Sequence, residues 1–88
     1  MEITDELSLA DLAQILFASP LQQSDRPTAA HVRGTVSRAL SASGGDCSSY
    51  AGYVAQEAGD HPEVYQRRMR WALAVVGEVY QPAFSLAA

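Results

Sequence analysis

The apolar residues of this chain recur at intervals that predict helices. Apolar and polar residues nowhere alternate with the period of two that is typical of a half-buried strand. The first predicted helix begins after Ser8, because Ser8 and Asp11 have the spacing of a capping box, and it ends at Pro20. A polar loop is expected over residues 21–27. The apolar stripe of this helix consists of Leu9, Leu12, Ile15 and Leu16.

Two further helices are expected in the middle of the chain. Thr28 is a suitable N-cap for the first of them, over residues 28–42. The stretch SASGG predicts its end, with Gly44 or Gly45 in the left-handed conformation. A shorter helix is expected to begin near Asp46. The apolar residues of these helices are Val32, Val36 and Leu40, and then Tyr50, Tyr53 and Val54.

The last predicted helix, residues 61–80, is the longest. Asp60 is expected to be its N-cap, with Glu63 completing a capping box, and Pro82 prevents it from continuing much further. On a helical wheel its apolar residues cover an arc of roughly 200°, whereas a surface helix needs a stripe of only a little over ~100°. Such an arc fits either the central helix of a bundle or a helix that faces its own core on one side and a partner on the other.

These elements predict an all-α fold, a compact bundle of about four helices with the longest helix at the C-terminal end as its organiser. A chain of 88 residues is long enough for one domain and too short for two. Residues 1–88 are therefore expected to form a single small helical domain. Its ends, residues 1–7 and 83–88, are expected to be flexible.

Charge and composition narrow the classes of partner. The formal net charge is −4, and all six basic residues are arginines. This acidic balance disfavours nucleic acid and anionic membrane surfaces, because binding to either needs a cluster of cations. The longest apolar run, residues 71–77, is far too short to span a bilayer. The acidic start of the chain lacks the basic region of a signal peptide, so a cytoplasmic protein is expected.

The sequence offers little catalytic chemistry. It contains no motif of a nucleotide-binding loop, a zinc protease or a paired-cysteine site. The separations of His31, Cys47 and His61 match no metal-ligand spacing. A nucleophilic pair of Cys47 and a histidine would need an oxyanion pocket that so small a chain can scarcely enclose. We therefore expect no enzyme activity, no metal or other cofactor and no small-molecule substrate.

The stretch GDHPEVYQRRMRW, residues 59–71, ends with three arginines and the only tryptophan in five consecutive positions. Arg67 and Arg70 lie on the polar side of the helical wheel, and Arg68 lies within the apolar arc. A charge in that arc must reach out to solvent, contact a partner or pair with a carboxylate, because burying it alone costs too much free energy. The candidate carboxylates of the acidic N-terminal block are Asp5, Glu6 and Asp11.

Trp71, at the edge of the apolar arc, is either a core residue or the anchor of an interface, since tryptophan and arginine dominate binding hot spots. The leading hypothesis is a non-enzymatic protein–protein interaction module with a regulatory or adaptor role. Its partner is another protein or a second copy of the chain, as in a homodimer. The predicted partner-binding residues are Arg67, Arg68, Arg70 and Trp71.

A DNA-binding transcriptional regulator is the alternative, with the helix over residues 28–42 as its recognition helix. Against it, the connection over residues 19–27 is longer than the about three or four residues of a helix-turn-helix, and Gly34 weakens the helix by up to ~1 kcal/mol. A second alternative is a purely structural domain that associates only with itself. The candidate DNA contacts are His31, Arg33, Thr35 and Arg38.

Two stretches, LFASPLQQSDRPTAAHVRGTV (residues 16–36) and VAQEAGDHPEVYQRRMRWAL (residues 54–73), resemble small uncharacterised helical proteins of GC-rich actinobacteria. The resemblance covers most of the chain and includes no catalytic motif. It implies a cytoplasmic bacterial protein. It supplies no activity, so no functional residue is carried over from it.

Overall fold

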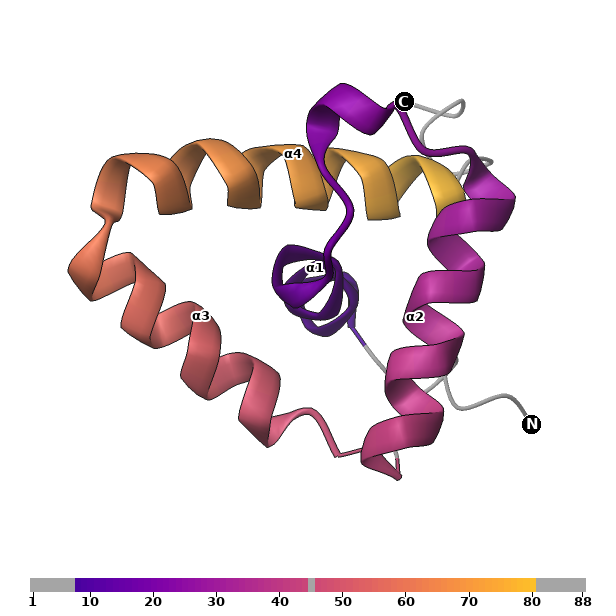
Figure 1. Cartoon of the computed structure of the whole chain (residues 1–88), viewed down its shortest axis with the longest axis horizontal. Helices are drawn as coiled ribbons and strands as arrows, with labels where there is room; N and C mark the ends of the chain where they lie inside the picture. The colour runs from indigo at the N-terminus through magenta and orange to yellow at the C-terminus, as the bar shows by residue number, and fades with distance from the viewer. Residues whose placement is uncertain (1–7, 45, 81–88) are drawn as a thin grey trace.

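The computed structural model describes residues 8–44 and 46–80 of the chain (Figure 1). The ends that were expected to be flexible, residues 1–7 and 83–88, lie outside the described residues. The described part is helical with no strand, and its longest helix is C-terminal, so the all-α prediction is confirmed. In chain order the elements are α1 (Leu9–Ala18), the short 3₁₀ helix η2 (Gln23–Asp25), α2 (Ala29–Ser43), α3 (Ser48–Asp60) and α4 (Pro62–Tyr80).

The central helix is α1. Figure 1 looks along its axis, with α2, α3 and α4 arranged around it as three sides of a triangle, and α1 contacts all three. The wide apolar arc of α4 does not place that helix at the centre, which corrects the expectation that the longest helix organises the bundle. A helix that is apolar on most of its circumference must be surrounded, and α1 has that property. Its buried residues are Leu12, Ala13, Ile15, Leu16 and Phe17.

The core forms where α2 and α4 pack on α1. The largest fully buried side chains are Ile15, Leu16, Val32, Val36 and Val76. Valine and alanine predominate among the core residues of α2 and α4, so the two helices pack on α1 through short side chains. Val32, Val36 and Leu40 of α2 are all buried, as the spacing of every fourth residue predicted.

Local capping sets three of the helix ends. Ser8 Oγ accepts a hydrogen bond from the Asp11 amide at 3.1 Å, and Asp11 Oδ2 accepts one from the Ser8 amide at 3.2 Å, so the predicted capping box is confirmed. Thr28 Oγ1 accepts a hydrogen bond from the amide of His31 at 3.1 Å, as predicted. At the other end of α2, Gly44 takes the left-handed conformation, with φ of 68°.

The predicted cap of the last helix is wrong. Asp60 is the last residue of α3, and His61 is the one residue between α3 and α4. The backbone carbonyl of His61 accepts a hydrogen bond from the Tyr65 amide at 2.8 Å. Because α3 continues through Gly59 and Asp60 before the chain turns, Asp60 is not free to cap the helix that follows.

Two glycines test these helix assignments. Gly52 lies inside α3 with open space where a Cβ would be, so Gly52→Ala should raise the free energy of unfolding by about 1 kcal/mol through better helix propensity. Gly44→Ala should lower it by about 1 kcal/mol, because alanine is strained at a φ of 68°. Urea denaturation followed by circular dichroism measures both changes, and a destabilised Gly52→Ala variant would contradict the position of α3.

Candidate functional site

The side chain of Arg68 binds the end of the central helix. Its Nε donates a hydrogen bond to the backbone carbonyl of Phe17 at 2.9 Å. Its Nη2 donates to the carbonyls of Ser19 and Leu21, each at 2.9 Å, and more weakly to that of Leu16 at 3.4 Å. One guanidinium therefore ties α4 to the last turn of α1 and to the segment that follows it.

The chemistry of a helix end explains this arrangement. The last carbonyls of a helix have no partner within the helix and carry partial negative charge, which a planar guanidinium with several N–H donors neutralises. Burial lowers the pKa of Arg68 from its ordinary value, and the nearby Tyr53 acts in the opposite direction. A guanidinium nevertheless keeps its charge at any physiological pH, so the hydrogen bonds remain charge-assisted.

Among the described residues, the partners of the Arg68 guanidinium are backbone carbonyls and not a carboxylate. Of the three candidates, Asp11 is engaged with the backbone of Ser8 at the opposite end of α1. Asp5 and Glu6 lie outside the described residues. The sequence suggested solvent, a carboxylate or a partner protein for a charge within the apolar arc, and backbone carbonyls were not among these alternatives.

Aromatic rings surround the same guanidinium. The Cζ atom of Arg68 lies 5.1 Å from the ring centroid of Trp71 and 5.5 Å from that of Phe17, within range of cation–π attraction. Phe17 also contacts Tyr65 and Tyr53, with centroid distances of 5.8 Å and 6.1 Å. Hydrogen bonds and rings together hold Arg68 in one place, and Arg68 in turn supports one face of the Trp71 ring.

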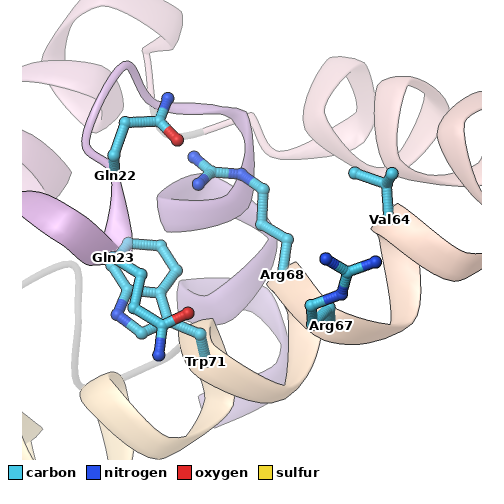
Figure 2. A pocket seen from close by; sticks show the side chains of 6 residues that line it. All are labelled: Gln22, Gln23, Val64, Arg67, Arg68 and Trp71. Atoms are coloured by element: carbon cyan, nitrogen blue, oxygen red, sulfur yellow. The ribbon is translucent and has the colours of Figure 1, made fainter.

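A small pocket opens beside this cluster, with a volume of about 160 Å³. Figure 2 shows the Arg68 side chain reaching from α4 toward the segment that carries Gln22 and Gln23. The pocket is lined by Gln22, Gln23, Val64, Arg67, Arg68 and Trp71, and we call it the α4 pocket. It combines two cations, two amides and apolar surface.

Trp71 is neither a core residue nor a fully exposed one. It packs against the core cluster and is half-buried, and it also lines the α4 pocket. Val64, one of the other lining residues, is 54% exposed. Trp71 therefore has features of both hypotheses: it packs on the core, and it also lines a pocket where an interface anchor would lie.

The structure brings three of the four predicted partner-binding residues together. Arg67, Arg68 and Trp71 line the α4 pocket, whereas Arg70 is exposed on α4 but does not line it. Arg68 contributes mainly through its internal bonds, since Nε and Nη2 are occupied by carbonyls. Sequence analysis missed Gln22 and Gln23, because nothing in a polar loop indicates which helix it will contact.

The loop that carries these glutamines is locally ordered. Asp25 Oδ2 accepts a hydrogen bond from the Gln22 amide at 2.9 Å, and the Arg26 amide donates one to the carbonyl of Gln23 at 3.1 Å. Arg26 adopts a φ of 48°, a left-handed conformation that is uncommon outside glycine. The η2 turn therefore presents Gln22 and Gln23 at the rim of the α4 pocket in a defined geometry.

The four candidate DNA contacts do not share one exposed surface. Arg33 Nη2 donates a hydrogen bond to the carbonyl of Val79 at the end of α4, at 2.9 Å. Thr35 is only 8% exposed, so its hydroxyl cannot reach into a groove of DNA. His31, Arg33 and Arg38 are exposed, although Arg33 is bound to the end of α4. Of the four candidates only Thr35 is buried, and DNA binding by this chain stays a prediction.

The described residues, 8–44 and 46–80, offer neither a metal centre nor a membrane-spanning helix. Within these ranges no group of three or more His, Cys, Asp or Glu side chains is placed to hold a metal ion. Within them, too, no helix has the length and apolar character needed to cross a membrane. Burial raises the pKa of the Cys47 thiol, with Asp11 and Asp46 adding to the effect.

Comparison with known proteins gives no relative. No protein family, no curated protein and no solved structure matches this chain. The resemblance to small helical actinobacterial proteins therefore stays a prediction.

Replacing Arg68 with methionine tests its structural role. Arg68→Met keeps most of the aliphatic stem but removes every hydrogen bond to the end of α1, so we expect a loss of about 2–4 kcal/mol in the free energy of unfolding. Arg67→Met is the matched control and should change it by less than about 0.5 kcal/mol, because Arg67 is exposed. Equal stability of the two variants in urea denaturation would show that Arg68 does not hold α1.

The Cys47 thiol should be less reactive than an ordinary cysteine. Its raised pKa leaves less thiolate at a given pH, and thiolate is the form that is alkylated. The midpoint of the pH profile of iodoacetamide alkylation should therefore lie higher in the folded chain than in the urea-unfolded chain. Asp46→Asn should bring the midpoint part of the way back, since the Asp46 charge is one cause of the shift. A midpoint below that of the unfolded chain would contradict this assignment.

Proposed function

We propose that this protein is a non-enzymatic interaction module, regulatory or adaptor in role, that binds a protein partner at the α4 pocket. The observation that carries the proposal is the half-buried Trp71 ring, which lies against an immobilised Arg68 beside the exposed Val64. Tryptophan and arginine are the residues most enriched in binding hot spots. Here they are placed around an open pocket.

The size of the pocket favours a protein partner. Its volume of about 160 Å³ suits one inserted side chain, whereas small-molecule sites usually measure about 300–1,000 Å³. Arg68 is already held by three carbonyls at 2.9 Å, so binding would not have to order it. Preorganisation of this kind improves affinity because fewer rotamers are lost when the partner binds.

The exposed cations indicate what the partner offers. Arg67 at the pocket and Arg70 nearby on α4 are both exposed. A partner with an apolar side chain for the pocket and a carboxylate beside it would satisfy both the Val64–Trp71 surface and Arg67. A second copy of this chain also qualifies, since its net charge of −4 provides many carboxylates. A homodimer and a complex with another protein are thus two forms of the same proposal.

Fluorescence of Trp71 reports on the α4 pocket alone, because it is the only tryptophan. In dilute protein we expect partial quenching by acrylamide, since the ring is half-buried. If a second copy occupies the pocket, quenching should fall as the protein is concentrated, and the mass measured by analytical ultracentrifugation should rise. Arg67→Glu should abolish both changes. Arg70→Glu should leave them, because Arg70 does not line the pocket.

Other outcomes are equally informative. A Trp71 ring that acrylamide cannot reach at any concentration would refute the proposal, since the pocket would then be closed. Unchanged partial quenching at all concentrations would exclude the homodimer and assign the pocket to a different protein. The two arginine variants then serve as the test and control for any candidate partner.

A further inference from the structure

A second and larger concavity lies between the end of α1 and α2. Its volume is about 410 Å³, and it shares no lining residue with the α4 pocket. Its accessible apolar surface includes Ala18, Pro20 and Ala39, and its polar surface comes mainly from α2. We call it the α1–α2 cleft. Unlike the α4 pocket, it falls within the usual size range of a small-molecule site, about 300–1,000 Å³.

One face of α2 supplies the polar groups of this cleft. His31, Thr35 and Arg38 are spaced four and three residues apart, so they lie on the same side of the helix and all three line the cleft. The hydroxyl of Thr35 is the only polar side-chain group among the buried core residues of the described chain. An imidazole and a guanidinium therefore stand beside a largely apolar cavity.

The Arg38 guanidinium lies back along α2. Its Nη2 is 3.5 Å from Thr35 Oγ1, which is a long and weak hydrogen bond. Its Nη1 is 3.4 Å from the position that a Cβ on Gly34 would occupy. Gly34 thus leaves room for this side chain. Most of the guanidinium donors have no hydrogen-bond acceptor among the described residues, so they can bind an anion.

The charges that line the cleft favour an anion over a cation. None of its ten lining residues is acidic, and α2 as a whole carries no acidic residue, in a chain whose net charge is −4. A cation in the cleft would lie next to Arg38 and His31, with no acidic lining residue to attract it. A carboxylate would meet a guanidinium with the planar geometry that favours paired hydrogen bonds. A single arginine matches the single charge of a carboxylate better than the higher charge of a phosphate.

We propose that the α1–α2 cleft binds a small carboxylate with an apolar body, such as a medium-chain alkyl carboxylate. The carboxylate is held by Arg38, with His31 beside it, and the apolar body lies on Ala18, Pro20 and Ala39. At the α3 side the cleft is bounded by Tyr50, whose hydroxyl donates a hydrogen bond to the Ala39 carbonyl at 3.0 Å. This proposal does not depend on the partner-binding role of the α4 pocket.

The test is a titration of the whole chain with octanoate below its micelle concentration, followed by amide NMR. We expect saturable shifts confined to residues around the cleft, that is residues 15–21, residues 31–39 and Tyr50 with its neighbours in α3. Octan-1-ol and octylamine are matched probes that keep the chain length and change only the head group. Both should bind at least about tenfold more weakly, because they lack the charge-assisted hydrogen bonds to Arg38. No saturable shift with octanoate, or equal binding of octan-1-ol, would overturn the proposal.

Variants distinguish head-group recognition from simple apolar binding. Arg38→Gln should weaken octanoate about tenfold and leave octan-1-ol unchanged, whereas Arg26→Gln, at an exposed arginine that lines neither cavity, should change neither. Ala39→Phe should weaken both probes by filling the cleft, and the amide spectrum of each variant shows whether it is folded. Tighter binding of a capped Leu-Glu dipeptide than of octanoate would overturn the assignment in favour of a peptide partner.

Discussion

The arrangement of the helices depends on how the end of α1 is satisfied. Because α1 is surrounded by the other helices, its last carbonyls lie beneath protein and need donors. Arg68 supplies them from α4, binding the carbonyl of Phe17 in the last turn of α1 and those of Ser19 and Leu21 just after it, each at 2.9 Å. The same contact fixes the segment that leads to Gln22, and so it positions one rim of the α4 pocket.

The end of α4 is also stabilised by an arginine from another helix. Neither α1 nor α4 has a basic residue in its own last turn, where a cation normally stabilises a helix. Arg68 provides the cation for α1, and Arg33 of α2 provides it for α4 by donating to the Val79 carbonyl. The arginines that bind the carbonyls at the ends of α1 and α4 therefore belong to other helices. Each of these helix ends is stabilised by a tertiary contact. Two of the six arginines hold the bundle together.

The candidate site was predictable in part. Arg67, Arg68 and Trp71 are neighbours in sequence, so the helical wheel alone placed them near one another at the edge of the apolar arc. Gln22 and Gln23 reach the same pocket from a loop more than forty residues away, and no local pattern reports such a contact. The α1–α2 cleft was not foreseen for the same reason, since its lining comes from three helices and a connection.

The sequence by itself determined the four α-helices of the described residues and most of their ends. The caps at Ser8, Thr28 and Gly44 follow from residues within a few positions, so local chemistry was enough. Only the tertiary structure decided that α1 is the central helix and that Arg68 turns inward to bind it. The width of an apolar arc shows how much of a helix must be covered but not what covers it, because that depends on contacts between residues far apart in the chain.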